Sequence, residues 1–160
     1  MRSQVFSEYA KIVLTIIVFG VMISFLTIYF PKYIQKYNCY LYLKTTMNPS
    51  ELPKQCKFLY YSAKKYTIKT DNVKEAVEEL VGLVSSCWID SDRGTVTHDI
   101  LCYLVKIDGN VTIKKEWILS NISSLTDVPV THIDIKLSKL YKGNITLIIY
   151  NGTSNKIIIW

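Results

Sequence analysis

An uninterrupted apolar stretch near the N-terminus constrains the fold of this chain more than any other feature. It runs from Ile12 to Phe30, nineteen residues without a charged side chain, and lysines flank it on both sides. As an α-helix rising about 1.5 Å per residue, it would be roughly 28 Å long, close to the thickness of the hydrocarbon core of a bilayer. We therefore predict a transmembrane signal anchor over residues 12–30, preceded by a cytoplasmic tail over residues 1–11.

Two other interpretations of this stretch are weaker. A buried helix of a globular core is usually shorter and apolar on one face, whereas this run is apolar all round. A cleaved signal peptide usually has an apolar region of about 7–15 residues and a small-residue cleavage site, but residues 27–31 are bulky. Within the run, Gly20 and Ser24 form a small-xxx-small pair that would let two helices approach closely. They are our candidates for a homo-oligomer contact.

Four cysteines define the expected covalent framework. They all follow the apolar stretch, and none forms the C-x-x-C pair typical of zinc or redox sites. An even number of widely spaced cysteines favours two disulfides in an oxidising compartment. Of the three possible pairings we prefer Cys39–Cys56 with Cys87–Cys102, and we expect the C-terminal domain to be extracellular.

Sequons for N-glycosylation point to the same orientation. Lys and Arg are balanced on the two sides of the apolar stretch, so the positive-inside rule does not decide it. A sequon at Asn48 is blocked by Pro49. The usable sequons all follow the apolar stretch and predict a glycoprotein modified at Asn110, Asn121, Asn144 and Asn151.

The rest of the chain is long enough for one compact domain, for which we predict an α+β fold. After a tyrosine-rich connector and loop over residues 31–55, the domain would occupy residues 56–160. Apolar residues recur at three- and four-residue steps from Val73 to Cys87, which predicts an amphipathic helix of about seventeen residues. We expect this helix to begin near Asn72, with Glu75 at capping-box spacing.

The remaining segments of the domain read mainly as strands. A second helix is favoured over residues 113–122, with a hairpin strand over 111–119 as the alternative. Strands are predicted over residues 56–61, 66–69, 99–107, 132–137, 145–150 and 156–160. The predicted domain is therefore two helices packed on a mainly antiparallel sheet of about five strands.

Residues suited to catalysis or cofactor binding are few. The only His/carboxylate pairs are His98-Asp99 and His132-x-Asp134, and we assign them surface or capping roles. The chain lacks G-x-S-x-G, H-E-x-x-H and a phosphate-binding glycine loop. We therefore predict no enzyme activity, no metal and no cofactor. The net charge of +6 comes from scattered lysines with only two arginines, which argues against nucleic acid as a partner.

Several short motifs in the second half of the chain are similar to those of one group of proteins. They are Cys87-Trp88, the Asp92-Arg93-Gly94 turn, residues 98–103 (HDILCY) and residues 145–153 (ITLIIYNGT). In this order they resemble uncharacterised archaeal single-pass membrane proteins with an N-terminal anchor and an outer Cys-Trp…Cys-Tyr domain. The resemblance covers about residues 70–160 and implies a membrane location and a helix–strand disulfide, without an activity.

These observations lead to a functional prediction. We expect a single-pass cell-envelope membrane protein whose disulfide-bonded, glycosylated outer domain acts in binding or assembly, with the membrane and an envelope protein as partners. The alternative is a pilin-like or filament subunit assembled through its N-terminal helix, although Tyr9-Ala10-Lys11 matches a prepilin processing site imperfectly. A third hypothesis, an outward-facing hydrolase, requires a free thiol or a bound metal.

Overall fold

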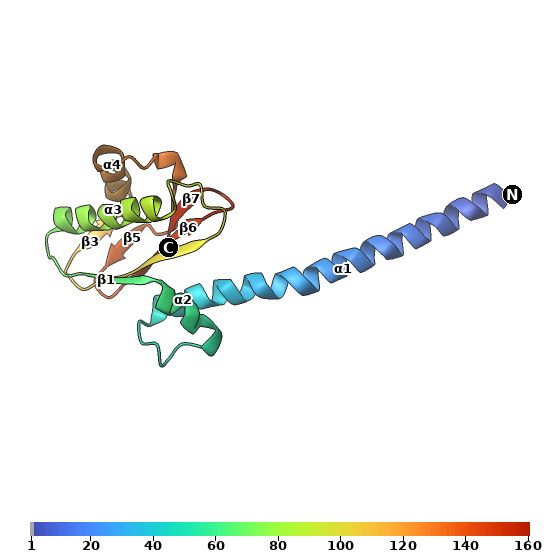
Figure 1. The fold of residues 1–160 in the computed structure, drawn as a ribbon, viewed down its shortest axis with the longest axis horizontal. Helices are drawn as coiled ribbons and strands as arrows, with labels where there is room; N and C mark the ends of the chain where they lie inside the picture. Colours follow the sequence, from blue (N-terminus) through green and yellow to red (C-terminus); the bar gives the residue numbers. More distant parts are fainter. Residues whose placement is uncertain (1) are drawn as a thin grey trace. The chain divides into compact units, whose positions relative to one another are not determined.

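The computed structural model describes the backbone of residues 2–160 and the side chains of residues 11–27 and 34–160. The chain divides into two compact units, Met1–Asn38 and Cys39–Trp160. Figure 1 shows the helices and strands of both in the order of the sequence. Because Leu43 and Leu52 are buried in the core of the second unit, part of the predicted connector belongs to this unit.

Helix α1 spans Arg2–Thr45 and contains the whole apolar stretch, and the first unit includes this helix as far as Asn38. The helix continues past Phe30 into the predicted tyrosine-rich connector, and its last turns, from Cys39, belong to the second unit.

The predicted transmembrane helix is wrong for the described chain. Among the residues that the structure describes, no helix has both the length and the apolar content needed to cross a membrane. The side chains of the predicted tail up to residue 10, and those at 28–30, lie outside the described residues.

A five-stranded sheet forms the centre of the second unit. Its strands lie in the order β1 (Lys64–Ile68), β2 (Ile100–Ile107), β6 (Ile145–Asn151), β7 (Lys156–Ile159) and β4 (Ile133–Ile135). The pairs β2–β6 and β6–β7 are antiparallel, but β1–β2 and β4–β7 are parallel. The sheet is therefore mixed, and the prediction of a mainly antiparallel sheet was wrong. A helix crosses over between β1 and β2, which makes a parallel pair possible.

That crossover is helix α3 (Val73–Asp90), which covers one face of the sheet. Its N-cap is Asn72, whose side-chain oxygen accepts a hydrogen bond from the backbone N–H of Lys74 at 2.9 Å. The predicted capping box does not form, because the Asn72 N–H donates to the Thr70 hydroxyl, which itself donates to the Glu75 carboxylate at 2.6 Å. The predicted apolar stripe packs against the strands through Ala76, Val77, Leu80, Val81, Val84 and Cys87.

The other face of the sheet is covered by the last turns of α1, by the loop that follows it and by α2 (Lys57–Ser62). The 3-10 helix η1 (Lys54–Cys56) joins this loop to α2. We predicted a strand over residues 56–61, and this was wrong. The buried residues of this segment are Cys56 and Ala63, with Leu59 partly buried between them. Spacings of three and four residues place such side chains on one face of a helix, and this outweighed the aromatic, strand-like composition.

The segment after β2 combines both of the predicted alternatives. β3 (Thr112–Lys114) pairs antiparallel with β5 (Lys139–Tyr141) in a separate two-stranded sheet. Helix α4 (Lys115–Leu125) follows at once and packs against α3 through the buried side chains of Ile118 and Ile122. A short 3-10 helix, η2 (Val130–His132), then leads into β4.

Candidate functional site

Two disulfide bonds cross-link the second unit. The bonds are Cys39–Cys56 and Cys87–Cys102, the pairing preferred from the sequence, with Cα–Cα distances of 5.2 Å and 5.6 Å. All four cysteines are buried. Every described cysteine is thus oxidised, and this part of the chain offers no thiol for a nucleophile.

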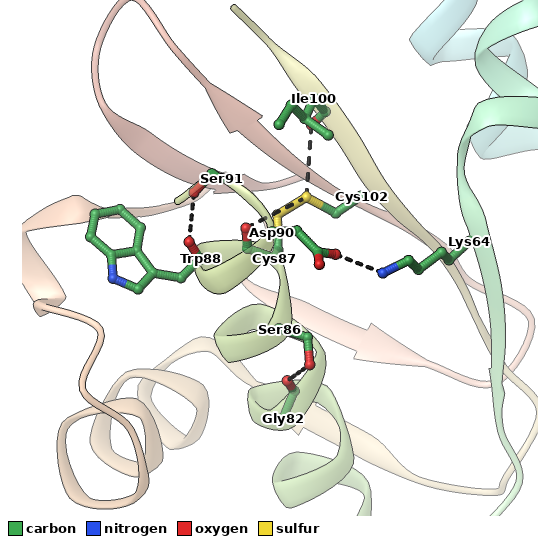
Figure 2. The surroundings of a disulfide bond; sticks show 9 residues. All are labelled: Lys64, Gly82, Ser86, Cys87, Trp88, Asp90, Ser91, Ile100 and Cys102. Atoms are coloured by element: carbon green, nitrogen blue, oxygen red, sulfur yellow. Dashed lines mark hydrogen bonds and ion pairs between the residues drawn. A yellow bond between two sulfur atoms is a disulfide. The ribbon is translucent and has the colours of Figure 1, made fainter. Parts of the chain in front are cut away.

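Each disulfide joins elements that are separate in the sequence. Cys39–Cys56 holds the end of α1 against η1, and Cys87–Cys102 holds the end of α3 against β2 (Figure 2). Cys102 lies at an irregularity in the pairing of β2 with β6. Lys64 and Asp90 form a hydrogen-bonded ion pair of 2.7 Å, which adds a contact between β1 and the same end of α3. The hydrogen bond to Asp90 is the main reason why the pKa of Lys64 is raised.

The turn after α3 has an unusual backbone. Asp92, Arg93 and Gly94 have φ values of 50°, 52° and 87°, all in the left-handed region. The Tyr150 hydroxyl lies 2.8 Å from the carbonyl oxygen of Gly94 and 2.9 Å from that of Val96, so it donates to these carbonyls. Burial, and then the charge of Asp99, raises the pKa of this hydroxyl. The backbone N–H groups of this turn are themselves hydrogen-bonded, so we assign it a structural role.

The two histidines do not form a metal site in the described chain. Nδ1 of His132 lies 2.6 Å from the carbonyl oxygen of Asn155, which can only accept, so Nδ1 carries the proton. The His132 ring also packs on Trp88, with 5.3 Å between the ring centroids. His98 is exposed, and no described group of three His, Cys, Asp or Glu side chains is arranged to hold a metal ion.

The neighbouring carboxylates have structural contacts. Asp99 accepts a hydrogen bond from the backbone N–H of Gly152 at 3.0 Å, which joins two loops. Asp134 forms an ion pair with Lys136 on the same strand segment. These contacts give the carboxylates of both His/carboxylate pairs a structural role.

The four sequon asparagines lie in different local settings. Asn110 is exposed in the turn before β3, whereas Asn144 and Asn151 are half-buried and their side-chain oxygens accept backbone hydrogen bonds. Asn121 lies on α4, and its side-chain nitrogen donates to the Trp117 carbonyl at 2.8 Å. Glycosylation at these positions stays a prediction, with Asn110 the most accessible acceptor in the folded domain.

A pocket of about 210 Å³ lies beside the small sheet. Burial lowers the pKa of Lys44 in its wall, and the Lys44 ammonium also lies 4.8 Å from the centre of the Trp160 ring. The pocket has no acidic residue in its lining, which consists of Lys44, Leu137, Lys139, Leu140, Tyr141, Gly143, Asn144 and Ile145.

The most extensive candidate surface is the apolar part of α1. Between residues 12 and 26 the large apolar side chains are all exposed, from 50% at Val18 to 66% at Ile16. We call this the α1 apolar surface; its large side chains are Ile12, Val13, Leu14, Ile16, Ile17, Val18, Phe19, Val21, Met22, Ile23, Phe25 and Leu26. Soluble monomers rarely expose a continuous apolar area of this extent, so it marks a site of interaction.

The Ser and Thr hydroxyl groups described between residues 11 and 27 are hydrogen-bonded within the helix. Thr15 donates to the carbonyl of Lys11 at 2.8 Å, Ser24 to that of Gly20 at 2.8 Å, and Thr27 to that of Ile23 at 3.0 Å. The described part of the surface therefore enters an apolar environment without leaving an unpaired hydroxyl.

Comparison with models of protein families, with curated proteins and with solved structures found no match for this chain. The resemblance to archaeal membrane proteins therefore stays a prediction, and the functional argument depends on the residues and contacts described above.

Sequence reasoning missed one feature that the structure makes visible. Helix α2 exposes Phe58 and Tyr61 beside several lysines. The sequence contained a pattern that predicts this helix, because Cys56, Leu59 and Ala63 have helical spacing and most residues between them are aromatic or basic.

Proposed function

We propose that this protein is an assembly subunit in which the α1 apolar surface packs against the same surface of other copies. The second unit, Cys39–Trp160, would be the domain that the assembly displays. This is the filament or assembly hypothesis from the sequence. The single-pass membrane arrangement is not part of the proposal, because it depended on a transmembrane helix.

The observation that carries the proposal is the exposure of the α1 apolar surface on every side of the helix. Fully burying a Val, Leu, Ile, Phe or Met side chain contributes about 1.5–3 kcal/mol relative to leaving it in water. A dozen such side chains along one helix give a large driving force for association. A helix that is apolar all round is stable only when other apolar groups surround it.

A second copy of the helix suits this surface in two ways. The stretch contains no charged residue, so identical surfaces meet without repulsion. A Cβ built at Gly20 would have no atom within 4 Å, and Gly20 lies one turn from Ser24. Two helices crossing at these small residues would bring their backbones close together, which strengthens van der Waals packing.

We also propose that the second unit lies outside the cytoplasm. Disulfides persist in oxidising compartments and are rare in the cytosol, and this unit contains two buried ones. The sequons after α1 support the same location.

The experiment is sedimentation velocity of the full chain over a range of concentrations. We expect association that Phe19→Lys abolishes, because a lysine in the interface would bury a charge. The matched control is Leu125→Lys, which places the same charge at a similarly exposed apolar residue (56% exposed) of the second unit and leaves association unchanged. Gly20→Leu should weaken association by preventing close approach.

Two results would oppose the proposal. One is a monomer at every concentration, with circular dichroism showing that the fold is intact. The other is association that Phe19→Lys leaves unchanged.

A further inference from the structure

We propose that α2 and its flanking residues form a binding surface for anionic lipid headgroups. The surface, here called the aromatic–lysine surface, consists of Lys54, Lys57, Phe58, Tyr60, Tyr61 and Lys65. It belongs to the second unit and is independent of the assembly function of α1.

The first observation is the exposure of large aromatic side chains on a short helix. Phe58 is 77% exposed and Tyr61 is 66% exposed. Phenylalanine has no polar atom that water can satisfy, so this degree of exposure is unfavourable unless the ring is covered by a partner.

The second observation is the local charge. Residues 54–69 contain five lysines and no aspartate or glutamate. Lys64 forms an ion pair with Asp90 on α3. The other lysines of this segment give the surface a positive charge. An anionic partner is therefore complementary to it.

The arrangement of the rings supports the same conclusion. The Lys65 ammonium lies 4.3 Å from the centre of the Tyr60 ring and 5.9 Å from that of Tyr61. The two tyrosine rings are edge-to-face, with 5.5 Å between their centroids. This packing places a cation beside two rings that each combine an apolar body with a polar hydroxyl, the combination found where proteins meet the headgroup region of a bilayer.

The surface is held on a rigid support. On the inner side of α2, Cys56 is bonded to Cys39, and Ala63 is buried with Leu59 against the sheet. The outer side chains are therefore presented by a fixed backbone, which reduces the entropy lost on binding.

A lipid surface fits these observations better than nucleic acid. Sequence-independent binding of single strands needs a basic groove that follows the backbone as well as stacking rings, whereas α2 is a helix of only six residues. Phe58, the most exposed ring, suits insertion among acyl chains near the headgroups.

The test uses the full chain and phosphatidylcholine vesicles prepared with or without phosphatidylglycerol. Phe58→Trp and Leu125→Trp place reporters at two exposed sites of the same unit. We expect brominated lipid to quench the added emission at position 58 and not at position 125. Any binding of vesicles through α1 would be common to both variants, so the difference between them isolates α2.

Charge variants complete the test. Lys57→Gln with Lys65→Gln should weaken binding to anionic vesicles on the order of tenfold. Lys142→Gln with Lys156→Gln removes the same charge elsewhere and should leave binding unchanged. Equal quenching at both positions would overturn the proposal. Equal binding to neutral and anionic vesicles, or lysine-dependent binding to an oligonucleotide in place of vesicles, would also overturn it. Sedimentation of the same variants without lipid shows whether assembly through α1 is intact.

Discussion

Thr146 is a buried polar residue whose hydroxyl has no hydrogen-bond partner among the described residues. It lies in β6, on the same face as Ile148 and Tyr150, both fully buried in the core that includes α3. A buried hydroxyl without a partner has lost its hydration, so Thr146→Val should raise the free energy of unfolding by about 1 kcal/mol. Thr146→Ser, which keeps the hydroxyl and removes a methyl group, should lower it. Chemical denaturation under oxidising conditions measures both, and destabilisation by valine would contradict this account.

Glycine is favoured at positions 94 and 143 for different reasons, and substitutions at the two positions can distinguish them. Both have positive φ, 87° and 86°, but a Cβ at Gly143 would meet nothing within 4 Å. A Cβ at Gly94 would overlap the Asn155 side chain and lie 2.7 Å from Cη2 of Trp88. We expect Gly143→Ala to cost about 1 kcal/mol from the backbone alone. Gly94→Ala should cost a further ~1–3 kcal/mol from steric overlap. Equal losses of stability in the two variants would show that the Asn155 and Trp88 side chains move aside at little energetic cost.

The Tyr150 hydroxyl gives the domain a predicted sensitivity to alkaline pH. Burial, and then Asp99, raises its pKa in the folded state above the ordinary value of 10.0. The folded state therefore keeps a proton that the unfolded state loses, so the free energy of unfolding should fall as pH rises above about 10. Burial lowers the pKa of Lys44, which acts in the opposite direction. The informative measurement is thus the difference between the wild type and Tyr150→Phe in denaturation across this pH range. The slope should be less negative in the variant, and identical slopes would refute the assignment.

At the scale of single residues, the sequence predicted covalent chemistry better than packing. Cysteine number and spacing predicted two disulfides and left three possible pairings, and the structure has the pairing that we preferred. The Thr146 hydroxyl and the contact between Gly94 and Trp88 depend on residues brought together by the sheet. No local sequence pattern predicts such contacts.

Among the elements, the two disulfides differ in what they hold. Each closes a loop of 15 or 17 residues, so the loss of either should cost about 3 kcal/mol in the chain-entropy model. Replacing Cys39 and Cys56 by alanine should loosen the end of α1 and α2. Replacing Cys87 and Cys102 should loosen the end of α3 against β2. Hydrogen exchange with mass spectrometry should locate the two effects in different segments. Loosening of the same segments in both variants would contradict this division.

Elements with a clear period were predictable, and elements defined by tertiary contacts were not. The apolar stripe of α3 and the Asn-Gly turn between β6 and β7 each carry a strong local signal. Helix α2 was predicted as a strand because aromatic residues such as those it contains are common in strands. The parallel pairs were missed because strand direction depends on a helical crossover and on the final place of β4 beside β7. The apolar run lies within the longer helix α1, and the transmembrane prediction for it was wrong, because no helix of the described residues is long and apolar enough to cross a membrane.

At the scale of the whole molecule, the two units have contrasting surfaces. The second unit has a buried core on both faces of its sheet and two internal cross-links, as expected of a domain that folds around its own core. The described side chains of the first unit form an apolar surface and include no buried core residue. We infer that contacts with other molecules bury the apolar side chains of the first unit, as the core buries those of the second.

The central claim is that α1 meets α1 of another copy, and photo-crosslinking in the native cell tests it most directly. A photoreactive phenylalanine analogue would replace Phe19 in α1, with Leu125 as the control position. The account predicts a crosslinked product with the mass of two chains from position 19 and none from position 125. Crosslinks from position 19 only to lipid or to a different protein would contradict it.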